Sequence, residues 1–160
     1  KFNTLISCDS KLPKKISQLT NITDDMLINQ PPINNVLNNF CSYIRGDVNK
    51  PQLTTYLIGH NAHSFDLPFL RAQCNKYEIK FPKVYTLDTM RMSQLLLEEQ
   101  YSHGLNALCS LFGVNNESAH RAYSDVGSTR IIFNHLCLLF KRKYKRCSPN
   151  MIYNHTSFVN

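Results

Sequence analysis

Residues 53–70 read LTTYLIGHNAHSFDLPFL, and this stretch decides the fold. Its first part, 53–58, is rich in β-branched and aromatic residues and stops at Gly59, which predicts a buried strand. Its second part predicts a helix from Phe65 to about Tyr77. We expect the buried side of that helix to hold Phe65, Phe69, Leu70 and Cys74. Asp66 therefore stands where a strand passes into a helix, the edge at which open α/β sheets bind ligands.

The rest of the chain continues the alternation of strands and helices. Short strands are expected at Phe2–Cys8 and Val84–Leu87. Helices are expected at Ile33–Ile44, Asp88–Leu97, His103–Phe112 and Ala122–Tyr144. The last of these should bury Ile131, Ile132, Leu136, Leu139 and Phe140. This order indicates α/β architecture, although three strands are few for the helices that they would carry.

The composition excludes several classes of protein. The chain has 160 residues, a formal net charge of +7 and 42% hydrophobic residues, which fits one folded domain rather than a disordered chain. No apolar run approaches the ~20 residues of a membrane span, and the N-terminus does not read as a signal peptide. The six cysteines form no C-x-x-C pair and favour reduced thiols. We therefore expect a protein of the cytoplasm or nucleus, not secreted and without a membrane segment.

A basic cluster lies near the C-terminus. It consists of Lys141, Arg142, Lys143, Lys145 and Arg146. Such a cluster can bind phosphates or serve as a nuclear address, or it can be the solvated end of a helix whose dipole favours cations. Residues 146–160 are expected to form a C-terminal tail after a domain that covers residues 1–145, with poor order from Ser148 to Asn160.

A second polar stretch, AHRAYSDV at residues 119–126, opens the last helix. An imidazole can activate a water molecule and a carboxylate can hold a metal ion, so His120 and Asp125 are candidates for chemistry. Asp66 is a further candidate, because hard cations prefer oxygen ligands. Taken singly, each residue also fits an ordinary role: Asp66 can cap its helix, and Asp125 can be stabilised by the helix dipole.

Taken together, these motifs resemble the DEDDh 3′→5′ exonuclease family in order and spacing. They are His60-Asn61 with Phe65-Asp66, Leu87-Asp88-Thr89, His103-Gly104-Leu105, and His120 with Asp125. The spacer between the first two pairs most resembles that of the three-prime repair exonucleases. The resemblance implies a ribonuclease H-like α/β fold, with a central mixed sheet flanked by helices.

The resemblance also implies a chemistry. Two Mg²⁺ or Mn²⁺ ions would support hydrolysis, with Asp66 and Asp125 as metal ligands and His120 as general base. Asp88 would have a supporting structural role. Residues implied to face the substrate are His60, Asn61, Phe65 and Leu67. The substrate would be the 3′ end of single-stranded DNA or RNA, with DNA favoured, and a homodimer is compatible with the family.

The sequence departs from the family at its first motif. An Asp-x-Glu pair, which supplies two of the four carboxylates, occurs nowhere in the chain. Without it we expect weak binding of the metal pair, and a sheet that lacks its first two strands and leaves an unpaired edge. The chain is then either an N-terminally incomplete piece of an exonuclease or an inactive module that binds nucleic acid or a protein partner. The retained His120, Asp125 and Asp66 favour the first interpretation.

Overall fold

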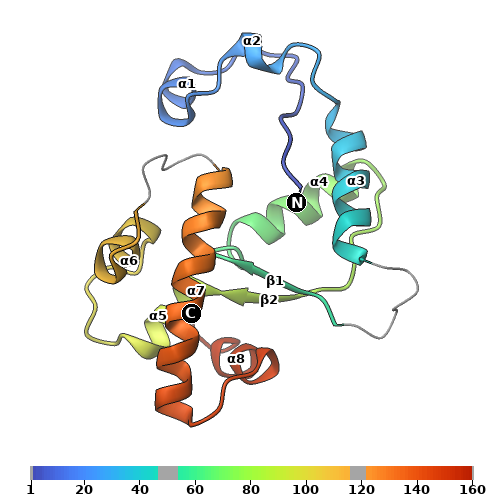
Figure 1. Cartoon of the computed structure of the whole chain (residues 1–160). Coiled ribbons are helices and arrows are strands. Elements are labelled where there is room, and N and C mark those ends of the chain that lie inside the picture. Colours follow the sequence, from blue (N-terminus) through green and yellow to red (C-terminus); the bar gives the residue numbers. More distant parts are fainter. Residues whose placement is uncertain (1, 47–53, 116–121, 160) are drawn as a thin grey trace. The chain divides into compact units, whose positions relative to one another are not determined.

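The computed structural model describes residues 2–46, 54–115 and 122–159 (Figure 1). Its elements are α1 (Lys14–Thr20), α2 (Asp24–Leu27), α3 (Ile33–Arg45), β1 (Tyr56–Gly59), α4 (Asp66–Lys76), β2 (Tyr85–Asp88), α5 (Thr89–Leu96), α6 (Leu105–Phe112), α7 (Ala122–Tyr144) and α8 (Pro149–Thr156). The chain divides into two compact units. One contains Lys1–Thr55 and Phe69–Lys83, and the other contains Tyr56–Pro68 and Val84–Asn160.

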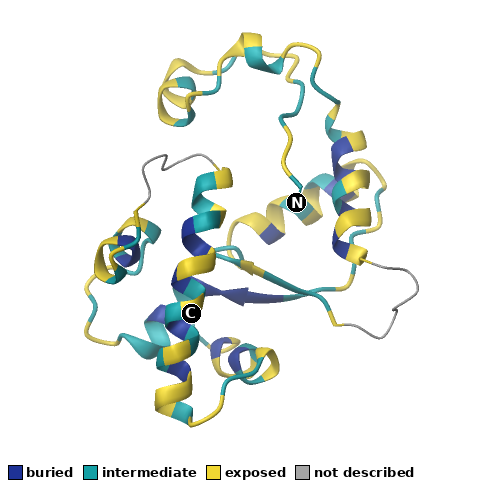
Figure 2. Cartoon of the chain, viewed as in Figure 1, coloured by how far each residue is buried: buried dark blue, intermediate teal, exposed yellow. Residues whose placement is uncertain are grey.

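The core of the first unit forms where α3 packs against α4. Val36, Leu37, Cys41 and Ile44 are the buried residues of α3, and their spacing is that of an amphipathic helix (Figure 2). Cys41 meets Cys74 of α4, with the two Sγ atoms 3.8 Å apart. Burial raises the pKa of the Cys74 thiol to about 11, so this thiol packs beside Cys41 as a neutral side chain. Gly46 ends α3 with a positive φ of 69°, which confirms the predicted end of that helix.

The second unit contains a parallel pair of strands. β1 pairs with β2 in the register Tyr56 with Tyr85 through Gly59 with Asp88. The four residues of β2 are half-buried or buried, whereas β1 exposes 46% of Ile58. Because the strands are parallel and end in register, the residues that follow β1 lie beside the end of β2. This edge is where the candidate site is built.

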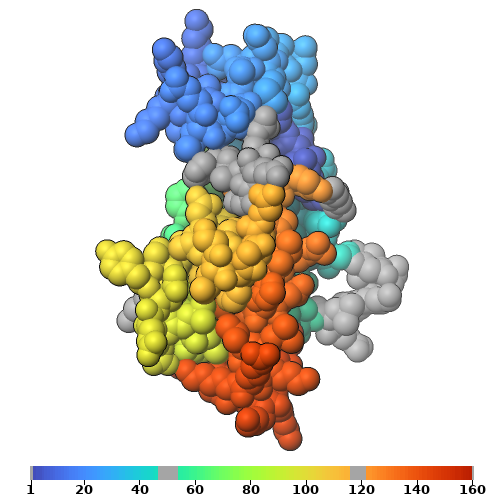
Figure 3. Space-filling model, turned by 60° about the vertical axis from the view of Figure 1, so that its left-hand side comes forward, coloured from blue at the N-terminus to red at the C-terminus, as the bar shows by residue number. Residues whose placement is uncertain are grey.

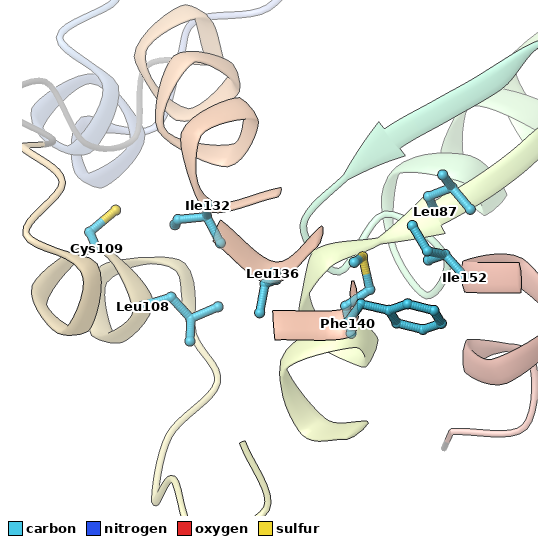
Figure 4. Packing of buried hydrophobic residues seen from close by; sticks show 8 residues of the cluster. Leu87, Leu108, Cys109, Ile132, Leu136, Phe140 and Ile152 are labelled. Atoms are coloured by element: carbon cyan, nitrogen blue, oxygen red, sulfur yellow. The ribbon is translucent and has the colours of Figure 1, made fainter. Parts of the chain in front are cut away.

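Helices α5, α6, α7 and α8 bury the core of the second unit. Leu108 and Cys109 of α6 face Ile132 and Leu136 of α7, and Phe140 lies further along the same helix (Figure 4). Burying each such large side chain contributes about 1.5–3 kcal/mol. Figure 3 shows the surfaces of α5 and α6 in yellow beside those of α7 and α8 in orange and red. The long helix α7 is therefore the centre of this unit.

The expected strand over Phe2–Cys8 is wrong. Residues 2–8 have no strand pairing, and the backbone N–H of Ser7 instead donates to the carbonyl of Pro31 at 3.0 Å. A strand exists only where a neighbour completes the hydrogen-bond ladder. The described residues accordingly form a two-stranded sheet rather than three strands.

The expected disorder of the C-terminal tail is also wrong. Residues 149–156 form α8, with the Ser148 side chain accepting the N–H of Met151 and a proline in the first turn. These are common helix-start signals. Ile152 of α8 is 1% exposed and packs in the core beside Leu87 of β2 (Figure 4). The domain boundary at residue 145 stays a prediction.

Helices α4 to α7 begin and end within about two residues of the sequence expectations, and the bounds of α7 match fully. Three burial predictions fail. Phe65 and Phe69 are 69% and 55% exposed, because the inward side chains are Leu67 and Cys74. Ile131 is 40% exposed, since the buried stripe of α7 runs through residues 132, 136 and 140.

None of the described helices combines the length and apolar character needed to cross a bilayer.

Candidate active site

The carboxylate of Asp88 holds together the loop at the carboxyl end of the two strands. Its Oδ1 accepts the backbone N–H groups of Asn61 and Met90, both at 2.9 Å. Its Oδ2 accepts the N–H of His63, also at 2.9 Å. Asp88 is only 3% exposed, so these charge-assisted bonds are protected from water. One side chain thus caps α5 and fixes the loop that follows β1.

The path of that loop depends on a tight turn at Gly59. A Cβ atom on Gly59 would lie 2.4 Å from the Cβ of Ala62, far closer than van der Waals contact allows. Asn61 has a φ of 57°, in the left-handed region that asparagine tolerates. The carbonyl of Asn61 then accepts the N–H of Phe65 at 3.1 Å. The loop therefore delivers Asp66 to the first position of α4.

His60 is oriented by Thr89, the first residue of α5. The Thr89 hydroxyl donates to the carbonyl of Gly59 at 3.1 Å and lies 3.0 Å from Nδ1 of His60. Since the single hydroxyl hydrogen is already used, Nδ1 must be the donor and Nε2 the atom with the free lone pair. Nε2 is buried and has no hydrogen-bond partner among the described residues. Burial lowers the pKa of His60, and the charge of Asp88 opposes this shift.

Asp66 carries a perturbed carboxyl group. Partial desolvation raises its pKa, the hydrogen bond with its own backbone lowers it, and the charge of Asp88 raises it further. The residue as a whole is nevertheless exposed. The structure therefore brings together the predicted residues His60, Asn61, Asp66 and Asp88 at one strand edge. A carboxyl group that can reach solvent yet has a raised pKa is typical of functional sites.

Asp125 lies in the first turn of α7, as expected. Its charge acts on Cys109 of α6: burial raises the pKa of this thiol, a hydrogen bond with Ser128 lowers it, and Asp125 raises it. The helix dipole favours a carboxylate at this position. His120, the predicted general base, lies outside the described residues. Its catalytic role therefore stays a prediction.

The predicted substrate residues differ in exposure. The ring of Phe65 is 69% exposed, so it is accessible to a ligand. Leu67 is 7% exposed and packs, which leaves its predicted substrate contact as a prediction only. Asn61 uses its backbone to shape the loop. Its side chain remains a candidate for substrate contact.

One residue of the predicted basic patch has partners in the protein. Lys143 Nζ donates to Glu98 at 2.9 Å and to the carbonyl of Leu95 at 3.0 Å. The hydrogen bond to Glu98 raises the pKa of Lys143. The remaining members of the patch, which are exposed, are Lys141, Arg142, Lys145 and Arg146. Lys143 therefore ties α7 to the end of α5 as well as adding charge.

The residues fit a divalent metal only in part. Asp66 and Asp125 offer the carboxylate oxygens that Mg²⁺ and Mn²⁺ prefer. Among the described residues, however, no group of three or more His, Cys, Asp or Glu side chains could hold a metal ion. A two-metal centre needs more ligands than these two carboxylates. The described residues therefore do not supply a complete ligand set for such a centre.

Sequence reasoning recognised Asp88 as a supporting residue but missed its hydrogen-bond partners. It also missed the contact between His60 and Thr89. A local signal for the first existed, since an aspartate before a helix commonly accepts an N–H in the first turn. The bonds across to Asn61 and His63 depend on the strand register, which no local pattern reports.

The fold of this chain is similar to that of a solved exonuclease structure. Exonuclease X, solved in complex with 5′ overhanging duplex DNA, superposes with a TM-score of 0.63 over 95% of this chain and 78% of that chain, at 17% identity. This likeness confirms a ribonuclease H-like α/β fold. The described strand pair is parallel.

Related sequences include two bacterial DNA polymerase III proteins. The chain is 36% identical over 129 residues to a PolC-type DNA polymerase III of Halalkalibacterium halodurans, covering 81% of this chain and 8% of the relative. It is 34% identical over 130 residues to the DNA polymerase III epsilon subunit of Treponema pallidum, covering 78% of this chain and 55% of the relative. The chain thus spans about half the length of one relative and a small part of the other.

The narrower likeness to the three-prime repair exonucleases stays a prediction. The family model for the exonuclease domain RNase_T matches residues 1–133, which contain the strand-end loop and the first turns of α7. The chain therefore belongs to the RNase_T exonuclease family, the DEDDh type of 3′→5′ exonuclease.

Proposed function

We propose that this chain acts as a metal-dependent exonuclease domain that hydrolyses phosphodiester bonds at the 3′ end of single-stranded nucleic acid, with DNA favoured over RNA. The observation that carries the proposal is the loop fixed by Asp88, which presents Asp66 at the carboxyl edge of a parallel strand pair. Ligands bind at this edge in open α/β sheets. Family membership supports the reaction class.

The family resemblance implies a role for each candidate residue, and the chemistry of its side chain is compatible with that role. Asp66 and Asp125 would hold Mg²⁺ or Mn²⁺, which when bound would activate water and stabilise charge on phosphate oxygens. His120 would accept the proton of the attacking water. Phe65 offers an exposed ring on which a terminal base could stack. The patch from Lys141 to Arg146 would attract the phosphate backbone.

A second candidate function has support of its own. The chain has no Asp-x-Glu pair, and its described part gathers no trio of metal-ligating side chains. These observations favour the alternative, an inactive module that binds nucleic acid or a protein partner. Only the first function requires release of nucleotides.

The test combines a cleavage assay with a binding assay on the same chain. A 5′-labelled single-stranded DNA and an RNA of the same sequence are incubated with Mg²⁺, with Mn²⁺ or with a chelator. Metal-dependent shortening from the 3′ end supports the exonuclease, and the DNA should be shortened faster than the RNA. Binding without shortening supports the non-cleaving module.

A matched pair of variants assigns the activity. Asp125→Asn should reduce nucleotide release at least about 100-fold, since a metal-ligand set that loses a member loses transition-state stabilisation. Asp25→Asn makes the same change of charge at an exposed residue of α2 and should leave the rate unchanged. An Asp125→Asn protein as active as its parent would refute the assignment.

A further inference from the structure

The first unit contains a groove with a basic lining, formed by residues that no part of the proposed chemistry uses. Its volume is about 290 Å³. It lies between the end of α3 and the segment that leads to β2. The residues that line it include Ile44, Arg45, Thr55, Lys80, Phe81 and Lys83. No acidic side chain is among the described lining residues.

Hydrogen bonds brace the walls of this groove. The guanidinium of Arg45 donates through Nη2 to the carbonyl of Lys80 at 2.8 Å, which ties the last turn of α3 to the opposite wall. The hydroxyl of Thr55 donates to the carbonyl of Ile44 at 3.4 Å. These bonds join segments that are far apart in the sequence. The lining residues of the groove are therefore joined to one another by hydrogen bonds.

The aromatic residue of the groove belongs to its wall. Phe81 is half-buried and packs against the core formed by Leu37, Cys41 and Cys74. Arg71 lies over its ring, 6.0 Å from the ring centre, and so brings a further cation close to the lining. A ring covered in this way is poorly placed to stack on a base. The groove thus favours a ligand recognised by its negative charge.

The cations of the groove have no acidic partner in the described part of the chain. The ion pair found among the described residues joins Lys143 to Glu98, and both of these residues belong to the other unit. Lys80 and Lys83 are exposed, and Arg45 uses one of its five N–H donors in the bond to Lys80. Arginine and lysine together around a small cavity are the usual partners of phosphate groups.

We propose that the groove of Arg45, Lys80 and Lys83 binds phosphate groups of a nucleic-acid strand. This inference rests on the proposed function, because it adds a second contact for the same substrate on residues that the proposed chemistry does not use. Free inorganic phosphate offers the same chemistry as a second source. The ligand that we propose is the strand, since three cations line the groove and a single phosphate neutralises about two of them at most.

The test compares two double variants with equal changes of charge. Lys80→Gln/Lys83→Gln removes two lysines from the groove, and Lys14→Gln/Lys15→Gln removes two exposed lysines of α1 in the same unit. Binding of a fluorescent single-stranded DNA is measured by anisotropy with a chelator present, so that no cleavage occurs. Loss of two phosphate contacts should weaken binding about 25-fold at about 0.1 M salt and reduce the salt slope by about 1.4. The α1 variant should change binding less than about threefold.

Footprinting identifies the source of the phosphate. In the unaltered chain, acetylation of Lys80 and Lys83 is followed by mass spectrometry with the DNA strand or with inorganic phosphate. Protection by the strand at concentrations that saturate binding supports the proposal. Protection by inorganic phosphate without protection by the strand overturns it, as does a groove variant that binds DNA like the α1 variant.

Failure of this inference can be separated from failure of the proposed function. If the chain binds and shortens DNA while the groove variant behaves like the α1 variant, the groove proposal is wrong and the exonuclease stands. If the folded chain binds no nucleic acid at all, both proposals are wrong.

Discussion

Replacing Asp88 by asparagine should loosen the strand-end loop more than any surface substitution. The parent carboxylate accepts the N–H groups of Asn61, His63 and Met90 at 2.9 Å each, while only 3% of Asp88 is exposed. Asparagine keeps one oxygen, which can still accept two of these bonds. The amide NH₂ of the asparagine then faces the backbone N–H of His63. Both groups are hydrogen-bond donors, so no bond forms between them.

The cost follows from the number and type of bonds. Hydrogen bonds to a charged group contribute about 2 kcal/mol each and neutral ones about 1 kcal/mol. The variant exchanges three bonds to a carboxylate for two to an amide oxygen. The expected loss is therefore about 4 kcal/mol of unfolding free energy. That is a large part of the 5–15 kcal/mol typical of a domain.

Two measurements check this prediction. Urea unfolding is followed by far-UV circular dichroism, since the chain has no tryptophan, with Asp25→Asn as the exposed control. Hydrogen exchange then shows where the loss occurs, and the amide of His63 should lose protection even if the variant stays folded. A loss below about 1 kcal/mol with the His63 amide still protected would show that the carboxylate does not hold this loop.

Three further predictions test the same unit. Gly59→Ala should destabilise the chain by about 2 kcal/mol or more, because the added Cβ has no space. Gly127→Ala adds a Cβ in open space within α7 and should stabilise the chain by about 0.5–1 kcal/mol. Urea unfolding measures both changes. The pKa of His60 is lowered, so below about pH 6.5 the unfolded state binds more protons than the folded state, and the stability of the chain falls as the pH drops. His60→Gln should make stability less dependent on pH, as measured by urea unfolding at pH values on both sides of 6.5. Ile152→Ala, at a buried site, should cost about 2–4 kcal/mol, and Phe158→Ala, 88% exposed, should cost less than about 0.5 kcal/mol; equal melting temperatures would refute the packing of α8.

Local sequence signals predicted helices α3 to α7 well. Gly46 and Gly113 each follow the last residue of a helix and adopt positive φ, as glycine does at such ends. The stripe of α7 that includes Ile132, Leu136 and Phe140 was also visible, because buried residues recur at helical spacing. Ser148 and Pro149 carried a start signal for α8 that an expectation of a tail overrode.

Signals that depend on distant partners were not readable. The apolar residues 2–8 resemble a strand, but pairing is decided by what lies beside them. Phe65 and Phe69 are exposed because the loop before α4 turns the other side of this helix inward. The hydrogen bond from the Asn61 N–H to the Asp88 carboxylate fixes that loop. The motif at residues 60–66 predicted the location of the site, whereas its geometry needed the register of the two strands.

The arrangement separates the group that shapes the site from the groups proposed to act in it. Asp88 is buried and fully occupied by backbone N–H groups, so it is poorly suited to ligate a metal or contact substrate. Asp66, five residues beyond Asn61, is exposed and carries a raised pKa, partly through the charge of Asp88. The buried carboxylate therefore fixes where its neighbour stands and also makes that neighbour harder to ionise.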